Sequence, residues 1–431
     1  MSLLDKIKSH TVEIAVIGAG YVGLPLALEM SKNNKVILFD VDKKKIDSIE
    51  KGRSYISDVT DTAISRAVNV GSISATCNEK MLEKADCFII CVPTPLNKNK
   101  QPELKYIISA TNNVVKHMRK QSLIVLESTT YPGTTEELVK PIFEYSGKEY
   151  GVDFFLAFSP ERVDPGNKEF NTLNTTKVVG GVCPVATELA RTLYEANLKC
   201  DVFTVSSPAV AEMSKILENT YRNINIALID EFACICHKMG IDVWEVVEAA
   251  KTKPFGFKAF YPGPGVGGHC IPLDPLYLAW KVKEYGMSLS LVETSEKILN
   301  NMPKYIVSRV VDILNDIRLP VCGSKILVVG VAYKEDISDY RESPALDIIK
   351  ELKLKNAEVS YFDPLVKSVL MNNKIIKSVE DDDVFAQKWD LIVIITGHSE
   401  IDYCRMIELN IPLFDTRNIL KEYHSNNIIK L

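Results

Sequence analysis

The first part of the chain alternates short apolar runs with amphipathic segments. An apolar run from Glu13 leads into a glycine turn and an amphipathic segment, and a second apolar run ends at Asp40. Further apolar runs follow at 85–95, 122–130, 154–161 and 176–181. Runs of this length between turn residues predict strands, and their continuous apolar character is typical of parallel strands covered on both faces. Residues 1–205 are therefore predicted to form a doubly wound, Rossmann-like α/β domain.

The middle of the chain changes to a helical period. Apolar positions recur at helical spacing from Ser206 to Gly240, which predicts one long helix, and a shorter helix is predicted over 241–252. Five prolines and five glycines in the segment 254–275 predict a loop. Helical spacing returns at 276–286 and again from Glu293 to Ile317. Residues 206–305 are predicted to form a central helical domain.

The last part of the chain repeats the architecture of the first. Apolar runs begin at Lys325, at Glu358 and at Trp389, and a predicted helix over 341–353 lies between the first two. The second run ends in Asp363, as the second run of the first domain ends in Asp40. Residues 306–431 are therefore predicted to form a second Rossmann-like domain, so that two doubly wound parallel-sheet domains flank the helical one.

Length, charge and cysteine content narrow the class of protein. At about 150 residues per domain, 431 residues correspond to roughly three domains. The 51 basic and 56 acidic residues give a net charge of -5, which argues against nucleic acid as a partner. The ten scattered cysteines include no C-x-x-C pair, so a reduced, cytoplasmic protein without a metal site is expected. No apolar run reaches the roughly 18 residues of a membrane span, and no membrane partner is expected.

A glycine motif in the first domain predicts a dinucleotide site. Gly18, Gly20 and Gly23 match G-x-G-x-x-G between a predicted strand and a predicted helix, and Asp40 closes the next strand. This arrangement places a pyrophosphate at a helix N-terminus and ribose hydroxyls on the acidic residue. Because Asp40 repels a 2′-phosphate, NAD is expected rather than NADP, although the lysines at 43–45 weaken that repulsion.

The sequence of the third domain indicates a phosphate-binding turn less clearly than the glycine motif of the first domain does. Only Gly330 stands at the turn that corresponds to the glycine motif, so a close backbone approach to a pyrophosphate is not expected there. A lysine at the end of the strand, Lys334, can hold a phosphate instead.

Cys270 differs from the other nine cysteines in its surroundings. It follows Gly267 and Gly268, which leave room for a ligand against the chain, and Asp274 lies four residues later. This pattern favours a nucleophile over a buried, inert thiol. The adjacent His269 is expected to be structural, because neighbours in an extended loop point apart.

Several polar residues are expected to gather near a ligand. Lys215 and Asn219 lie one turn apart on the long helix, where a cation and an amide can stabilise an oxyanion, although a solvated surface pair is the alternative. Glu161 follows a strand of the first sheet, at the edge where open sheets bind ligands. The segments with Thr129 and with Pro93 and Thr94 end their strands at the same edge.

Seven runs of the chain resemble the UDP-glucose/GDP-mannose dehydrogenase family. In order they are GAGYVGLPLA, CVPTPLNK, ESTTYPGTTEE, SPERVDPGN, EMSKILENTYRNINIAL, FYPGPGVGGHCIPLDPLYL and AYKEDISDYRESPALDI. The resemblance covers nearly the whole chain and is strongest to the bacterial branch that oxidises UDP-N-acetylglucosamine for surface polysaccharides such as O-antigen. It implies a four-electron oxidation of the sugar C6 alcohol to a carboxylate with two NAD+.

The resemblance also implies roles for the polar residues. Lys215 and Asn219, with a bound water, would manage the alcohol proton and hold the oxygen. Cys270 would add to the C6 aldehyde and carry a thiohemiacetal and then a thioester. Glu161 would act as the general base of hydrolysis, with Asp274 and Thr129 ordering the water.

Carried over by motif, two sets of contacts follow from the resemblance. Contacts to NAD fall on Tyr21, Val22, Asp40, Lys45, Pro93, Thr94, Thr129 and Arg341. Contacts to the UDP-sugar fall on Arg162, Val163, Lys215, Asn219, Arg222, Phe257, Phe260, Tyr261, Gly265, Tyr333, Lys334 and Arg417. The C-terminal domain is thus expected to bind UDP, and a homodimer or higher homo-oligomer paired through the long helix is implied.

One position separates branches of the family. The UDP-glucose branch usually carries a second glutamate four residues after the one at Glu161, and this chain has Pro165 there. That departure favours a UDP-N-acetylhexosamine over UDP-glucose. UDP-N-acetylgalactosamine and UDP-N-acetylmannosamine stay open as alternatives to UDP-N-acetylglucosamine. Two other classes of protein stay open as alternatives. One is a single-step alcohol dehydrogenase, which needs no thiol, and the other is a non-catalytic sensor of NAD or nucleotide sugars.

Overall fold

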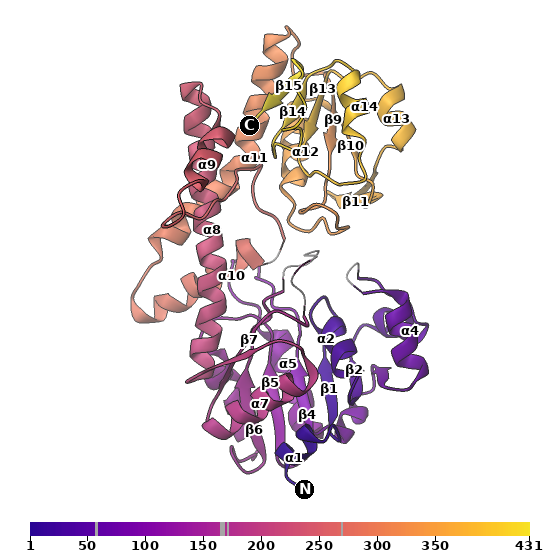
Figure 1. Ribbon diagram of the computed structural model, residues 1–431, viewed down its shortest axis with the longest axis vertical. Coiled ribbons are helices and arrows are strands. Elements are labelled where there is room, and N and C mark those ends of the chain that lie inside the picture. Colours follow the sequence, from indigo (N-terminus) through magenta and orange to yellow (C-terminus); the bar gives the residue numbers. More distant parts are fainter. Residues whose placement is uncertain (57–58, 164–168, 170–171, 269) are drawn as a thin grey trace. The chain divides into compact units, whose positions relative to one another are not determined.

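The chain divides into two units that share two helices. The computed structural model describes residues 1–56, 59–163, 169, 172–268 and 270–431. Unit 1 contains Met1–Glu218 and Leu276–Met287, and unit 2 contains Asn219–Pro275 and Ser288–Leu431. Two helices, α8 (Pro208–Met239) and α10 (Cys270–Lys281), contribute residues to both units (Figure 1).

Unit 1 is built on an eight-stranded sheet with the strand order β3-β2-β1-β4-β5-β6-β7-β8. The strands are β1 (Glu13–Ile17), β2 (Lys35–Phe39), β3 (Ile73–Thr76), β4 (Cys87–Ile90), β5 (Ser122–Leu126), β6 (Phe154–Phe158), β7 (Lys177–Gly181) and β8 (Val202–Val205). Every neighbouring pair is parallel except β6 and β7, which are antiparallel. The doubly wound α/β class predicted for this region is confirmed, with the last two strands, β7 and β8, running opposite to the other six.

The reversal of β7 corrects the prediction of a parallel strand over 176–181. An apolar run shows that a strand is buried, but its letters carry no signal for strand direction. In the observed register Gly181 pairs with Ala157 and Gly180 with Phe158. The start of β7 therefore lies at the edge where β6 ends, and a polar residue at that start faces the segment that follows β6.

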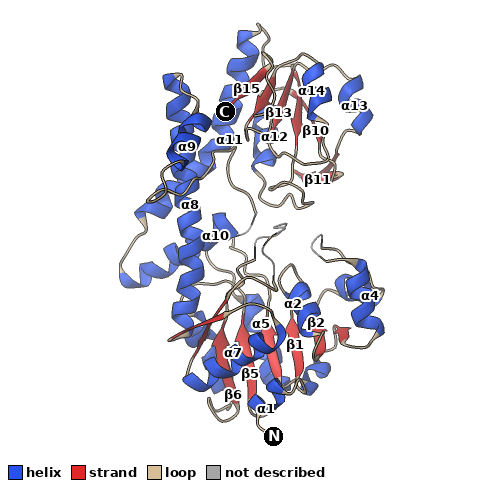
Figure 2. Cartoon of the chain, viewed as in Figure 1, coloured by secondary structure: helices blue, strands red, loops and turns tan. Residues whose placement is uncertain are grey.

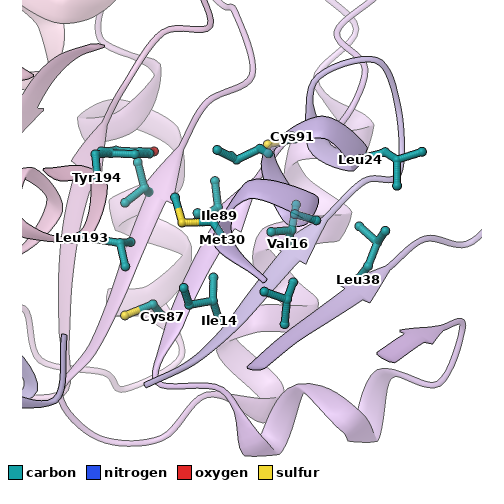
Figure 3. Packing of buried hydrophobic residues seen from close by; sticks show 14 of the residues in the cluster. Ile14, Val16, Leu24, Met30, Leu38, Cys87, Ile89, Cys91, Leu193 and Tyr194 are labelled. Carbon is teal, nitrogen blue, oxygen red and sulfur yellow. The ribbon is translucent and has the colours of Figure 1, made fainter. Parts of the chain in front are cut away.

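Helices cover both faces of this sheet (Figure 2). The helical segments are α1 (Leu3–Lys8), α2 (Gly23–Met30), α3 (Lys43–Glu50), α4 (Asp61–Asn69), η1 (Glu79–Lys84), α5 (Lys105–His117), η2 (Thr135–Val139), α6 (Lys140–Tyr145), α7 (Pro184–Asn197) and η3 (Val282–Tyr285). Alternate residues of each strand enter opposite cores. Ile14 and Val16 pack with Leu193 and Tyr194 of α7 on one face (Figure 3), and Ile17 lies in the core of the other face.

Unit 2 contains a smaller sheet of five parallel strands in the order β10-β9-β13-β14-β15. The strands are β9 (Lys325–Val329), β10 (Glu358–Phe362), β13 (Leu391–Ile394), β14 (Leu413–Asp415) and β15 (Ile428–Lys430), with a separate hairpin of β11 (Ser368–Met371) and β12 (Lys374–Lys377). Its helices are α9 (Val243–Lys251), α11 (Ser290–Asp316), α12 (Pro344–Leu354), α13 (Asp381–Ala386) and α14 (Tyr403–Glu408). The second Rossmann-like sheet is thus present as predicted.

One core of unit 2 joins this sheet to the central helices. Ile326 and Val328 of β9 pack in the same cluster as Trp244 of α9 and Val310 of α11. The opposite face of the sheet has its own cluster, which includes Leu327 and Trp389. The helices predicted in the middle of the chain therefore pack on the C-terminal sheet.

The helical predictions agree with the structure except at one point. The long helix is α8, which ends at Met239 just before Gly240. The predicted loop to Pro275 is wrong in its last part, because α10 begins at Cys270. Pro272 lies in the first turn of that helix, where a missing N–H costs little, so the proline does not prevent a helix from starting. Among the described residues, no helix is both long and apolar enough to cross a membrane.

Candidate active site

The glycine turn after β1 has two glycines that are required by packing and one that faces open space. Gly18 has a φ of +105°, and a Cβ on it would lie 2.4 Å from the carbonyl oxygen of Cys91. A Cβ on Gly23 would collide with the carbonyl of Gly18, whereas a Cβ on Gly20 would meet nothing within 4 Å. Helix α2 begins here without a side-chain cap, although the Leu24 N–H already bonds to the Gly20 carbonyl at 3.1 Å and Pro25 has no N–H. These features fit a dinucleotide pyrophosphate approaching at Gly20.

Asp40 is buried at the end of β2 and holds the glycine turn. Its Oδ2 accepts the N–H of Ala19 at 2.8 Å, and its Oδ1 accepts the N–H of Asp42 at 2.8 Å. The Lys45 ammonium lies 3.3 Å from Oδ2, so two residues expected to contact NAD form an ion pair with each other. Of the two residues between the last glycines of the motif, Tyr21 is exposed and Val22 is half-buried.

The ends of β4 and β5 meet at one edge, as the sequence predicts. The Ser128 hydroxyl donates to the carbonyl of Val92 at 2.8 Å, which ties the segment with Thr129 to the segment with Pro93 and Thr94. Thr129 and Thr94 are half-buried, and Pro93 is exposed. The Tyr277 hydroxyl donates to the Thr94 carbonyl.

The next stretch of the loop after β5 is held by a buried glutamate of α8. Glu212 accepts the N–H of Gly133 at 2.6 Å and the N–H and hydroxyl of Thr135 at 2.9 and 2.6 Å. Burial raises the pKa of Glu212, and these donors partly oppose the rise. The sequence places Glu212 on a face with Lys215, but its carboxylate contacts this loop.

Glu161 lies in a cluster of charges at the same edge. Its Oε1 accepts the N–H groups of Arg162 and Val163 at 2.7 and 2.8 Å, and its Oε2 lies 3.3 Å from the ammonium of Lys177. Burial alone raises the pKa of Glu161, but Lys177, the two N–H groups and Lys215 together lower it below its ordinary value. The carboxylate is therefore ionised at neutral pH.

Two of the expected substrate residues near Glu161 have partners within unit 1. The Arg162 guanidinium pairs with Glu218 of α8 at 2.8 Å and donates to the carbonyl of Thr176 at 2.9 Å. The Val163 N–H is used by Glu161. Lys215 is 7% exposed, and its charge acts on Glu161 through space.

In unit 2, α8 and α10 meet through polar side chains. The Nδ2 of Asn219 donates to the Oδ2 of Asp274 at 2.5 Å, and both residues are buried. One turn further along α8, Asn223 donates from Nδ2 to the carbonyl of Ile271 at 3.0 Å, and Ser295 of α11 donates to the Oδ1 of Asn223 at 2.5 Å. Two residues separated widely in sequence, Asn219 and Asp274, are thus in direct contact.

The contact with Ile271 has a specific cause. Pro275 lies inside α10 and has no N–H to donate to the carbonyl four residues before it, which is that of Ile271. Asn223 supplies the missing donor. Cys270 is the first residue of this helix and is exposed. His269 lies outside the described residues.

The glycine-rich loop before Cys270 packs on the C-terminal part of unit 2. A Cβ on Gly263 would lie 2.4 Å from an Arg417 guanidinium nitrogen, and Arg417 donates to the Gly265 carbonyl at 3.4 Å. A Cβ on Gly268 would lie 2.9 Å from the ring of Tyr333. Tyr333 and Arg417, which are expected to bind the UDP-sugar, therefore contact the loop that contains a third expected residue, Gly265.

Other expected contacts of the loop point to α8 and α9. Tyr261 donates from its hydroxyl to Glu248 of α9 at 2.6 Å. Phe260 packs edge-on against Tyr221 with ring centroids 5.8 Å apart, and Phe257 is exposed.

The remaining expected cations of unit 2 lie at its surface or near it. Arg222 is exposed, and Lys334 is half-buried. Arg341 is exposed, and its guanidinium pairs with Asp339 at 2.6 Å. Because Arg341 belongs to unit 2, its assignment to NAD stays a prediction.

Sequence reasoning missed three buried polar residues that contact the predicted ones. They are Lys177, Asn223 and Asp230, whose Oδ1 accepts the N–H of Gly263 at 2.9 Å. A charged residue at the start of an apolar strand was a usable signal for Lys177. Nothing in the spacing of Asn223 or Asp230 distinguishes them from other polar residues on a helix.

Comparison with known proteins gives the same family for all three predicted domains of the chain. The NAD binding domain of the UDP-glucose/GDP-mannose dehydrogenase family matches residues 12–198, its central domain 209–301 and its UDP binding domain 327–422. The expectation that NAD is the cofactor is thereby confirmed.

Relatives of two named activities align over most of their length. UDP-N-acetyl-D-glucosamine 6-dehydrogenase of Pseudomonas aeruginosa is 38% identical over 358 residues, which are 83% of this chain and 84% of that protein. UDP-N-acetyl-D-mannosamine dehydrogenase of Pyrococcus horikoshii is 34% identical over 418 residues, which are 95% and 96% of the two chains.

The fold agrees with these alignments. The solved structure of the UDP-D-ManNAc dehydrogenase from Pyrococcus horikoshii superposes with a TM-score of 0.87 and 32% identity, covering 97% of this chain and 98% of that one. Sequence motifs, domain matches and fold therefore agree, and the chain belongs to the UDP-glucose/GDP-mannose dehydrogenase family.

Proposed function

We propose that the protein oxidises the C6 hydroxyl of a UDP-N-acetylhexosamine to a carboxylate, with UDP-N-acetylglucosamine as its substrate. The observation that carries the proposal is the contact of Asn219 with Asp274 on the helix that begins at Cys270. A thiol, an amide and a carboxylate on joined helices suit an oxidation that proceeds to the acid. The name of the relative from Pseudomonas aeruginosa supports the choice of sugar.

NAD would be held by unit 1. The pyrophosphate would lie against the open face of Gly20, and Asp40 would accept hydrogen bonds from ribose hydroxyls. When bound, NAD accepts a hydride from the substrate carbon. Thr94 and Thr129 lie on neighbouring strand ends and are proposed as further contacts.

In the first oxidation, Lys215 and Asn219 act on the substrate oxygen. The C6 alcohol loses a proton and a hydride, and an aldehyde results. The Asn219 amide donates to the oxygen, and Lys215 directs the departing proton to a bound water. Asp274 fixes the amide of Asn219, since its carboxylate accepts one of the two amide hydrogens.

In the second oxidation, Cys270 carries the substrate. Its thiolate sulfur bonds to the aldehyde carbon, and the carbonyl oxygen takes a proton to give a thiohemiacetal. Loss of a hydride from that carbon and a proton from its oxygen leaves a thioester. The position of Cys270 at the first residue of α10 favours the thiolate, because a helix N-terminus stabilises negative charge.

Hydrolysis releases the product. Glu161 accepts a proton from the attacking water, the C–S bond breaks, and Cys270 leaves as the thiolate. Its lowered pKa keeps Glu161 in the form that can accept that proton. For each sugar, one water is consumed and the products are a carboxylate, two hydrides and three protons, so two NAD+ are used.

We also propose that the protein forms a homodimer through α8. Its second half exposes large apolar side chains, with Leu228 at 49%, Phe232 at 44% and Ile235 at 46%. Exposed apolar rows of this kind favour burial against a second copy. Light scattering is expected to give twice the monomer mass of 48.2 kDa.

A panel of substrates tests the proposed reaction. Purified protein with NAD+ is offered UDP-N-acetylglucosamine, UDP-N-acetylgalactosamine, UDP-N-acetylmannosamine and UDP-glucose, with NADH absorbance and anion-exchange chromatography as readouts. UDP-N-acetylglucosamine is expected to give two NADH and an acidic product. A preference for UDP-N-acetylmannosamine, which is named for the relative from Pyrococcus horikoshii, would replace the proposed sugar. Absence of NADH with every sugar would favour a sensor.

A further inference from the structure

Four polar side chains form a buried chain that ends at Glu161. Tyr194 of α7 donates to the Oε1 of Glu127, and the Oε2 of Glu127 lies 3.0 Å from the ammonium of Lys177. Lys177 in turn lies 3.3 Å from the Oε2 of Glu161. The side chains of Lys177 and Glu127 are 4% and 0% exposed, and that of Glu161 is 14% exposed.

The reversed strand β7 makes this chain of contacts available. Glu127 directly follows β5, and Glu161 follows β6, both at the carboxyl edge of the sheet. Lys177 begins β7, and because β7 is antiparallel to β6, its first residue lies at that same edge. A parallel β7 would put its first residue at the opposite edge.

The charges of the cluster depend on Lys177. Burial lowers the pKa of a lysine, but Glu127 and Glu161 raise the pKa of Lys177 above its ordinary value, so the ammonium is retained. Burial raises the pKa of Glu127 despite the attraction of Lys177. Glu161 is the carboxylate that the cluster holds most firmly in its ionised form.

We propose that Lys177 is a positioning residue that orients the carboxylate of Glu161 and compensates its charge, while Glu127 and Tyr194 fix Lys177 in turn. The inference rests on the proposed function, in which Glu161 accepts the proton of the water that hydrolyses the thioester. The carboxylate presents one oxygen to the two backbone N–H groups and the other to Lys177, which fixes its plane.

The pH profile of turnover tests the role of Lys177. In the unaltered protein Glu161 stays ionised, so kcat is expected to show no loss from this group between about pH 7 and about pH 5. In Lys177→Met, burial is no longer opposed by the ammonium, so the pKa of Glu161 rises. We expect kcat to fall about tenfold across that pH range, with little change in KM for the sugar.

The trapped intermediate gives a second readout. Rapid quenching of Lys177→Met with UDP-N-acetylglucosamine and NAD+, followed by mass spectrometry of the intact protein, is expected to show a sugar adduct that increases as pH falls. A flat pH profile without an adduct would overturn the inference.

A charge-balanced variant keeps the test valid if Lys177→Met does not fold. Lys177→Met/Glu127→Gln removes one charge of each sign, and buried pairs tolerate joint replacement better than the loss of one partner. Glu161 still lacks its ammonium in the double variant, so the fall in kcat at low pH is expected there too. A flat profile in the double variant would equally overturn the inference.

Lys281 provides a matched control within unit 1. It is also buried between two carboxylates, Glu137 at 2.5 Å and Glu284 at 2.7 Å. Lys281→Met is expected to keep the flat profile, and the same loss at low pH would assign the effect to general destabilisation. Glu161→Gln tests the role of Glu161 separately from that of Lys177. Rapid turnover by Glu161→Gln would contradict the proposed role of Glu161 as the general base of hydrolysis.

Discussion

Asn219 and Asp274 form a buried hydrogen bond between helices α8 and α10, with 2.5 Å between Nδ2 and Oδ2. Because one N–H of the Asn219 amide is bonded to Asp274, the carboxylate fixes the orientation of the amide and the direction of its second N–H. An amide held in this way needs no reorientation when charge develops on a substrate oxygen. The pair therefore links the packing of the two helices to the proposed oxidation.

Asp274→Asn is expected to lower kcat about a hundredfold, because an amide can turn its NH2 group as well as its oxygen towards Asn219 and therefore no longer fixes the orientation of the Asn219 amide. Thermal unfolding should change little, because a hydrogen bond between the two side chains can form in either orientation. Asp274→Ala removes the acceptor, leaves a buried donor unsatisfied and should also cost about 1–3 kcal/mol of stability. Asp242 is another carboxylate of unit 2 and caps α9. Asp242→Asn serves as the control and is expected to keep a normal kcat. Wild-type turnover by Asp274→Asn would contradict this account.

Cys270→Ser is expected to stop the reaction after the first oxidation. A serine hydroxyl is a much weaker nucleophile at neutral pH, so the aldehyde is not carried to a thioester. With limiting sugar, the endpoint should fall from two NADH to at most one, without an acidic product. Cys322→Ser, an exposed cysteine of the same unit, should keep both. Two NADH from Cys270→Ser would exclude the covalent route.

The contact of Asn223 with Ile271 predicts a coupling with Pro275. Asn223→Ala leaves the Ile271 carbonyl without its donor and should destabilise the protein by about 1–2 kcal/mol. Pro275→Ala restores an N–H four residues after Ile271, so the same Asn223→Ala change should cost less in that background. Chemical denaturation of the four variants measures the coupling. Additive effects would show that Asn223 does not replace the missing backbone donor.

The fold was predictable where its signals are local. The period of apolar residues identified α8 and both Rossmann-like sheets, and the glycine spacing identified the turn at Gly18. The direction of β7 and the start of α10 at Cys270 were not predictable in this way. An apolar strand reads the same in both directions, and a proline is compatible with the first turn of a helix as well as with a loop.

The candidate site was predictable in its residues but not in their partners. Motifs indicated Glu161, Asn219 and Asp274, whereas the contacts that hold them come from distant strands and helices. Lys177 reaches Glu127 across 50 positions, a pairing that depends on sheet order and on the antiparallel direction of β7. No periodicity within a single segment contains that information.

The glycine turn predicts opposite outcomes for two adjacent motif positions. Gly18→Ala places a methyl group against the Cys91 carbonyl at a positive φ, which should cost about 2 kcal/mol or more. Gly20→Ala fills space that is open in the protein and should keep the thermal midpoint. Because NAD is proposed to approach there, its KM for NAD should rise about tenfold or more. Normal NAD kinetics in Gly20→Ala would contradict the proposed pyrophosphate position.

Asp230 predicts a stability change that depends on pH. Burial raises its pKa to about 7, against the opposing effects of the Gly263 N–H and Arg417, and its Oδ2 has no hydrogen-bond partner among the described residues. A carboxyl with a raised pKa in the folded state favours folding when protonated, and that contribution is lost as pH rises towards and through about 7.

Asp230→Asn removes this titration while its amide oxygen still accepts the Gly263 N–H. At about pH 8 the variant should be more stable than the unaltered protein by an amount on the order of 4 kcal/mol at most, and at about pH 4 the two should be nearly equal. Thermal unfolding at a series of pH values measures the difference. Asp312 is an exposed carboxylate of α11. Asp312→Asn should therefore show no pH-dependent difference in stability from the unaltered protein. A stability difference for Asp230→Asn that is the same at every pH would show that Asp230 does not titrate in this range.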